Sequence, residues 1–121
     1  TNHSGGLRYH GMSYHLSHLY NLGLMRAKAY GQKECFEAGV TFGNQEGIIP
    51  APEATHAVKG AMDAALDCKE KGESKTILFN LCGHGHFDMA AYDDYFSGRL
   101  ADDIFEEESV NKAMSNLPEV A

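Results

Sequence analysis

The chain has 121 residues, 43% of them hydrophobic and 22% charged, which is the size and composition of one globular domain at most. Its formal net charge of −7 and the lack of a basic stripe argue against nucleic acid as a partner. No apolar run approaches the ~18–20 residues of a membrane helix and no secretory-type start is visible, so we expect a soluble, cytoplasmic protein without membrane contact.

The first third of the chain predicts a loop, a helix and a strand. Residues 1–11 contain neither a cap nor a periodic pattern, which is typical of a loop. Leu16, Leu19 and Tyr20 follow at i, i+3 and i+4, and Gly23 suits a helix end, so we expect a helix over 13–22. The apolar residues of 24–30 predict a short strand that ends at Gly31.

Two further helices are expected in the middle of the chain. The first covers 33–45 and turns Phe36, Val40 and Phe42 inward. The second begins at Pro52, where a missing N–H costs nothing, has Glu53 in its first turn and ends near Gly72. Its apolar stripe consists of small residues, which suits close packing on a sheet: Ala54, Ala57, Val58, Ala61, Ala65 and Leu66.

A strand is predicted directly after that helix. Residues 76–81 read T-I-L-F-N-L and are apolar on both faces, as in a strand buried in a parallel sheet. A helix followed by a buried strand is the α/β rhythm. We therefore expect an α/β fold, a partial three-layer domain with a mainly parallel sheet flanked by helices. Residues 101–121 carry a net charge of −5 and form an acidic tail.

The segment Cys82-Gly83-His84-Gly85-His86 follows the predicted strand and is the best candidate for a ligand site. Ligands of open α/β sheets gather at the carboxyl ends of the strands, and glycines let backbone N–H groups approach a ligand closely. The alternative is a tight turn with a buried structural cysteine. Three cysteines without a C-x-x-C pair indicate a reduced, intracellular compartment.

Other polar residues have both a functional and a structural interpretation. His84 and His86, with an upstream histidine, are candidates for a small metal-binding domain, although their spacing matches no strong zinc motif. Glu53 is either a functional carboxylate or a residue that offsets the helix dipole. Arg8 is either a ligand for a carboxylate or phosphate, or an exposed loop residue.

Three motifs together resemble a known family. They are G-G-L-R-Y-H-G-M (5–12), E-G-I-I-P-A-P-E-A-T-H-A (46–57) and I-L-F-N-L-C-G-H-G-H-F-D (77–88). In this order and spacing they resemble the C-terminal part of the tryptophan synthase β chain, in particular its second, divergent type. The resemblance covers residues 1–100 and implies the fold type II architecture of pyridoxal-phosphate enzymes. It also implies a lyase of tryptophan biosynthesis that condenses L-serine, or an activated serine, with indole.

The resemblance also implies roles for individual residues. Cys82 matches the neutral hydroxyl that meets the pyridine nitrogen of pyridoxal phosphate, and Gly83 and Gly6 lie beside the ring. Glu53 lies near the cofactor. Two other assignments are that Arg8 binds the substrate carboxylate and that backbone carbonyls of Tyr9 and Gly11 hold a monovalent cation. A neutral partner leaves the nitrogen largely unprotonated, which favours loss of the β-leaving group.

Two parts of such an enzyme have no counterpart in this sequence, the Schiff-base lysine in its family context and a G-G-G-S-N-type phosphate loop. We therefore expect a fragment that is inactive alone and has the N-terminal part of the enzyme as its partner. The resemblance implies a homodimer for the complete enzyme, and Arg8, where the better-studied type has an acid, puts an α-subunit partner in question. The alternative is a non-catalytic binding or interaction module of the same ancestry.

Overall fold

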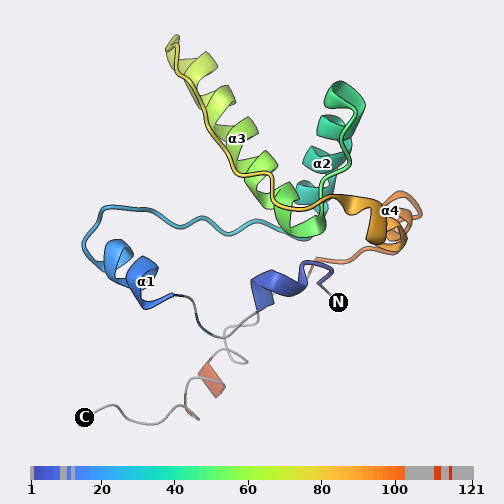
Figure 1. The fold of residues 1–121 in the computed structure, drawn as a ribbon, viewed down its shortest axis with the longest axis horizontal. Helices are drawn as coiled ribbons and strands as arrows, with labels where there is room; N and C mark the ends of the chain where they lie inside the picture. The colour runs from blue at the N-terminus through green and yellow to red at the C-terminus, as the bar shows by residue number, and fades with distance from the viewer. Residues whose placement is uncertain (1, 9–10, 12, 103–110, 113–114, 116–121) are drawn as a thin grey trace.

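The computed structural model describes residues 2–8, 11, 13–102, 111–112 and 115. Figure 1 shows an open arrangement in which two long helices diverge from a common base. The elements, with short 3-10 helices labelled η, are η1 (Gly5–Arg8), α1 (Tyr14–Asn21), α2 (Gln32–Glu46), α3 (Pro52–Lys71), η2 (Gly85–Phe87) and α4 (Met89–Phe96). The predicted helices at 13–22, 33–45 and from Pro52 to Gly72 are thus confirmed, whereas α4 was not predicted.

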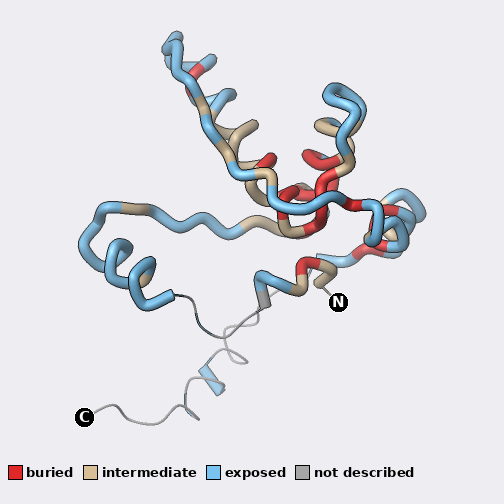
Figure 2. Tube along the Cα trace, in the orientation of Figure 1, coloured by how far each residue is buried: buried red, intermediate tan, exposed pale blue. Residues whose placement is uncertain are grey.

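The buried residues gather where α2 and α3 meet, near the start of both helices (Figure 2). Phe36 of α2 is 1% exposed, and the aromatic ring of Tyr92 from α4 lies against it at a centroid distance of 5.0 Å. Val58 and Thr55 of α3 are fully buried beside α2. The first part of the α3 stripe, with Ala54 and Val58 buried, therefore packs on a helix rather than on a sheet, and Gly39 of α2 lets the two backbones approach. The end of the stripe, Ala65 and Leu66, is exposed.

The start of α2 is held by carboxylates from two places in the sequence. Glu34 accepts a hydrogen bond from the Gly31 amide at 2.8 Å, and Asp102 accepts one from the Lys33 amide at 2.9 Å. Gln32 also donates to the carbonyl of Ala101. The segment just after Leu100, which was expected to begin an acidic tail, thus caps a helix, because free N–H groups in the first turn need acceptors. The rest of the tail lies largely outside the described residues.

Replacing Asp102 by alanine removes the acceptor of the Lys33 amide. We expect Asp102→Ala to lower the free energy of unfolding by about 1 kcal/mol, the usual cost of a lost helix cap. Urea denaturation of the chain measures this loss. Asp67→Ala is the control, because Asp67 pairs with Lys71 on the exposed surface of α3, where an ion pair contributes little. Equal stabilities of Asp102→Ala and the unmodified chain would contradict the capping role.

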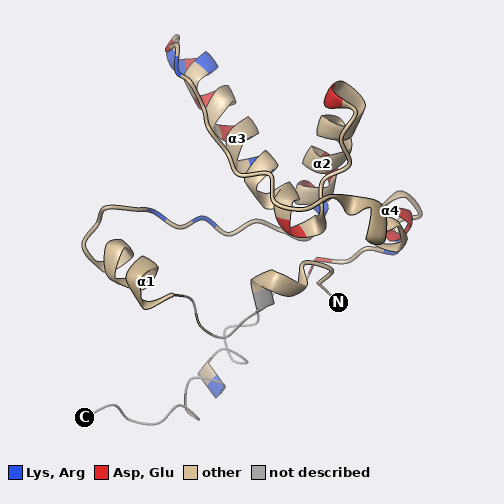
Figure 3. Ribbon diagram, viewed as in Figure 1, with Lys and Arg blue, Asp and Glu red and all other residues tan. Residues whose placement is uncertain are grey.

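Helix α1 stands apart from the paired helices (Figure 1), and none of its residues is buried. Its sequence, Y-H-L-S-H-L-Y-N, contains no lysine, arginine, aspartate or glutamate, so it is uniformly tan in Figure 3. Charged residues lie instead along α3 and near α2 and α4, and basic residues also mark the extended segment that leads from α1 to α2. The apolar spacing of 13–22 therefore predicted the helix correctly. Within the described residues, however, no face of this helix is buried.

The predicted parallel sheet is wrong. Within the described part of the chain, residues 24–30 and 76–81 are extended, but the structure contains only one isolated antiparallel bridge, between Pro50 and His84. The segment 76–81 runs back along α3 (Figure 1), with Ile77 and Phe79 half-buried and Leu78 95% exposed. A strand is defined by hydrogen bonds to a neighbouring strand, and neither segment has such a neighbour among these residues. The described fold is helical rather than α/β.

None of the described helices combines the length and the apolar character that crossing a bilayer requires.

Candidate functional site

Two segments that are far apart in the sequence pair by their backbones at the base of α3. We call Ile49–Ala51 the strap and Cys82–His86 the glycine loop. The Gly85 amide donates to the carbonyl of Ile49 at 2.7 Å, and the Ala51 amide donates to the carbonyl of Gly83 at 3.2 Å. Pro50 and His84 form the antiparallel bridge between these two hydrogen bonds. The second and third sequence motifs therefore meet in one small structure.

Glycine is required at both glycine positions of the loop, for different reasons. Gly83 has φ of +86°, in the left-handed region that side chains disfavour. At Gly85 a Cβ atom would lie 2.6 Å from the Pro50 carbonyl oxygen and 2.7 Å from Cγ2 of Ile49. The G-x-G spacing that marked this loop as a ligand site thus also serves close packing against the strap.

Glu53 links the first motif to the other two. It lies in the first turn of α3, two residues after the strap, and its side chain is half-buried. Its Oε1 atom accepts a hydrogen bond from the Gly6 amide of η1 at 3.1 Å. A carboxylate at a helix N-terminus offsets the helix dipole, and this one also holds a loop 47 residues away in sequence. Glu53 therefore has a structural role at the start of α3, and its role near a cofactor stays a prediction.

The predicted site residues are only partly brought together. Gly6 contacts Glu53, and Gly83 contacts Ala51, two residues before Glu53. Cys82 immediately precedes Gly83 and is exposed, which contradicts the interpretation of a buried structural cysteine. Gly11 has open space around it. The Arg8 side chain and Tyr9 lie outside the described residues, so the substrate and cation assignments stay predictions.

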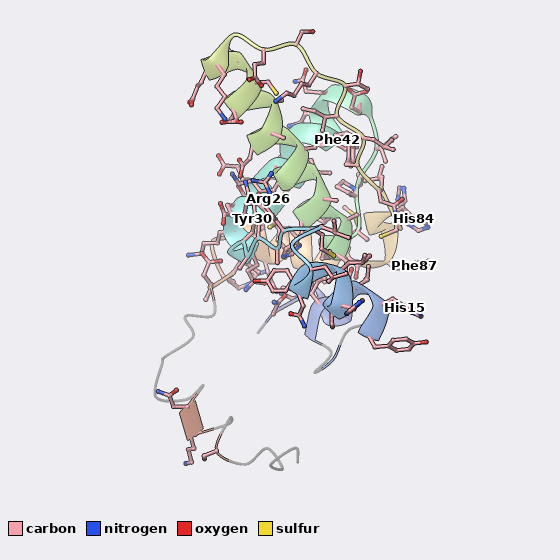
Figure 4. The ribbon with its side chains drawn as sticks, turned by 90° about the vertical axis from the view of Figure 1, so that its left-hand side faces the viewer. His15, Arg26, Tyr30, Phe42, His84 and Phe87 are labelled. Carbon is pink, nitrogen blue, oxygen red and sulfur yellow. The ribbon has the colours of Figure 1, made fainter. Side chains whose placement is uncertain are left out.

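The two histidines of the glycine loop interact with each other. The Nδ1 atom of His84 accepts a hydrogen bond from the His86 amide at 3.3 Å, and their ring centroids are 5.0 Å apart. The Phe87 ring, 93% exposed, lies 5.3 Å from that of His84, and both lie on the same side of the molecule in Figure 4. Among the described residues no third histidine, cysteine or acid joins them to form a metal-binding group.

Tyr92 is a site residue that the sequence analysis missed. It is 4% exposed, and its hydroxyl donates to the carbonyl of Pro50 at 2.6 Å. Burial, with a smaller contribution from the Asp88 carboxylate, raises the pKa of Tyr92 to about 12. The spacing of Tyr92, Tyr95 and Phe96 at i, i+3 and i+4 is the signal that could have revealed α4 and this residue.

The remaining cysteines are not part of the site. Cys35 of α2 is fully buried, and Cys68 near the end of α3 is 9% exposed. Burial and the nearby Glu34 carboxylate raise the pKa of the Cys35 thiol to about 12. Cys35 therefore stays protonated and unreactive at neutral pH, which leaves Cys82 as the exposed thiol of the described residues.

No protein-family model matches the sequence, but comparison with known proteins identifies tryptophan synthase β chains as relatives. The chain is 63% identical over 98 residues to tryptophan synthase beta chain 2 of Methanosarcina mazei and 61% identical over 100 residues to that of Aquifex aeolicus. It is 50% identical over 116 residues to tryptophan synthase beta chain of Pyrococcus horikoshii. These matches cover 81%, 83% and 96% of the chain, respectively.

The chain spans only 22%, 23% and 25% of the length of these three relatives. The matches confirm the resemblance that the three motifs predicted. They support neither of the alternatives, a small metal-binding domain or a non-catalytic binding or interaction module of the same ancestry.

Proposed function

Since the chain is homologous to about a quarter of the tryptophan synthase β chains, we propose that it forms the part of such an enzyme that faces the pyridine nitrogen of pyridoxal phosphate. The complete enzyme is a lyase that condenses L-serine, or an activated serine, with indole to give L-tryptophan. The observation that carries this proposal is the convergence of three motifs: the Gly6 amide binds Glu53, and the glycine loop pairs with the strap that leads into Glu53.

The residues of this site fit the pyridine side of the cofactor. Cys82 is exposed and offers a neutral hydrogen-bonding group. Gly83 has no side chain, and a Cβ atom added there would lie 3.3 Å from Cβ of Ala51. The Glu53 carboxylate is fixed by the Gly6 amide. These groups provide hydrogen-bonding partners and a stable backbone, which is what a protein contributes to chemistry that belongs to the cofactor.

Each residue of this part of the site has a defined task. The cofactor, when bound, supplies the electron sink for β-replacement. The Cys82 thiol would meet the ring nitrogen as a hydrogen-bonding partner. Glu53 holds the Gly6 amide of η1 in place. The role proposed for Arg8, in the same 3-10 helix, is to bind the substrate carboxylate. Backbone carbonyls of Tyr9 and Gly11 bind a monovalent cation.

The lysine and the phosphate loop come from the N-terminal part of the enzyme, which is the partner of this chain. The complete enzyme acts as a homodimer. Residues 1–100 form the contribution to the enzyme, and Ala101 and Asp102, at the beginning of the acidic segment 101–121, cap α2.

A complementation experiment tests the proposed function. The chain is coexpressed with the remaining three quarters of the Methanosarcina mazei relative, and serine-dependent formation of tryptophan from indole is measured. We expect activity from the mixture and from neither part alone. Lys71→Gln in the chain is the control, because Lys71 lies on the exposed far end of α3 and should leave the activity unchanged. A mixture no more active than the relative's part alone would contradict the proposal.

The chain alone is expected to hold no cofactor covalently, because its lysines are not in the required context. Incubation with pyridoxal phosphate, borohydride reduction and mass spectrometry of the chain check this. Stoichiometric labelling of one specific lysine would show that the chain carries the covalent site itself.

A further inference from the structure

The strap and the glycine loop share an anchor outside both segments. The two backbone hydrogen bonds between them, from Gly85 to Ile49 and from Ala51 to Gly83, flank Pro50. Pro50 is fully buried and, as a proline, has no N–H to donate. Its carbonyl accepts from the Tyr92 hydroxyl at 2.6 Å. A side chain from α4 thus takes the place that a third strand would have in a sheet.

The phenol ring of Tyr92 is itself fixed from three directions. Its edge lies against the Phe36 ring of α2, at an interplanar angle of 73°. Its Cε2 atom would be 3.0 Å from a Cβ at Gly85, and its hydroxyl 3.1 Å from a Cβ at Gly39. A side chain confined in this way has little rotamer freedom, so its hydroxyl defines where the Pro50 carbonyl can lie.

The hydroxyl is a permanent donor in this position. Burial raises the pKa of Tyr92 to about 12, so the hydroxyl keeps its proton at neutral pH. The Pro50 carbonyl is buried and needs a donor, because an unsatisfied buried carbonyl costs free energy. Loss of the hydroxyl therefore leaves an acceptor without its partner at the centre of the strap.

We infer that Tyr92 is a positioning residue that fixes the strap against the glycine loop and thereby sets Cys82 relative to Glu53. Cys82 adjoins Gly83 of the loop, and Glu53 lies two residues after Ala51 of the strap, so the two hydrogen bonds anchored by Tyr92 connect the two residues. The consequence for the cofactor rests on the proposed function, whereas the positioning of the backbone does not.

Hydrogen exchange of the Tyr92→Phe chain tests the positioning directly. The substitution keeps the ring and removes only the hydroxyl. We expect the Gly85 and Ala51 amides to exchange about tenfold faster than in the unmodified chain, while the Val58 amide inside α3 keeps its rate. Tyr95→Phe is the matched control, because Tyr95 stacks on the same Phe36 ring at 5.9 Å from the same helix. It should leave all three rates unchanged.

Two outcomes would overturn the inference. Unchanged exchange at Gly85 and Ala51 in Tyr92→Phe would show that the hydroxyl does not hold the strap. An equal acceleration at all three amides would show a general loss of stability rather than positioning.

The complemented enzyme provides a second measurement. There Tyr92→Phe should shift the absorbance spectrum of bound pyridoxal phosphate, and Tyr95→Phe should not. An unchanged spectrum would overturn the link between Tyr92 and the cofactor. If the unmodified mixture binds no cofactor, the proposed function fails and the link to the cofactor fails with it, whereas the exchange rates still decide whether Tyr92 positions the backbone.

Discussion

Gly39→Ala is expected to destabilise the chain by about 2 kcal/mol, although alanine is the better helix former by about 1 kcal/mol. Gly39 lies in the middle of α2, where a Cβ atom would be 2.6 Å from Cγ2 of Thr55 and 3.1 Å from the Tyr92 hydroxyl. Thr55 is fully buried, so its methyl group has no free space to move into. Overpacking of this kind outweighs the gain in helix propensity.

Gly60→Ala is the matched control for this prediction. Gly60 also lies inside a helix, α3, but the nearest atom to its Cβ position is the Tyr30 hydroxyl at 3.8 Å, an ordinary contact. We therefore expect Gly60→Ala to raise the stability by about 1 kcal/mol. Urea denaturation measures both variants.

A rescue variant identifies the clash itself. Thr55→Ser removes the Cγ2 methyl group and keeps the hydroxyl that donates to the Pro52 carbonyl at 2.6 Å. The double variant Gly39→Ala/Thr55→Ser should recover most of the lost stability. Gly39→Ala as stable as the unmodified chain would contradict the close approach of α2 and α3.

Cys82→Asp is expected to lower the activity of the complemented enzyme roughly a hundredfold. An acid beside the pyridine nitrogen would hold that nitrogen protonated and make the ring a stronger electron sink. A stronger sink no longer favours loss of the β-leaving group. Cys82→Ser keeps a neutral partner with stronger hydrogen bonding and should retain activity within about threefold. Serine-dependent tryptophan formation and the absorbance spectrum of the bound cofactor measure the difference.

Two further measurements test whether the charge of the introduced carboxylate causes the loss of activity. Cys82→Asn has nearly the shape of Cys82→Asp without its charge, so it should lose far less activity. Because Cys82 is exposed, none of these substitutions should change the unfolding of the chain by more than about 0.5 kcal/mol. Equal activities of Cys82→Asp and Cys82→Asn would show that Cys82 does not meet the ring nitrogen.

The long helices could be predicted because their signals are local. Pro52 at the first helical position and Gly72 in the left-handed conformation at the end define α3 within a residue. The start of α2 depends on Glu34, which lies three residues after Gly31, and on an acid that is remote in sequence, Asp102. The contribution of Asp102 could not be predicted, because no local pattern connects Asp102 to Lys33.

The candidate site was predicted in part. The motifs identified four residues through resemblance: Gly6, Glu53, Cys82 and Gly83. The hydrogen bond between Gly6 and Glu53 and the contact between Gly83 and Ala51 became visible only in the tertiary structure. Tyr92 was missed because its role depends on a carbonyl 42 residues away in sequence. The interpretation of 76–81 as a strand failed because a run that is apolar on both faces favours an extended backbone but cannot supply a neighbouring strand.

The sequence by itself determined where helices begin and end, because caps, propensities and apolar spacing act over a few residues. It also determined the family resemblance, which depends on short motifs in order. The tertiary structure decided what those helices pack on, which buried carbonyl a tyrosine satisfies and which backbone segments pair. Such choices depend on atoms that meet only after folding, when each buried polar group must find a partner and each buried methyl group must find space.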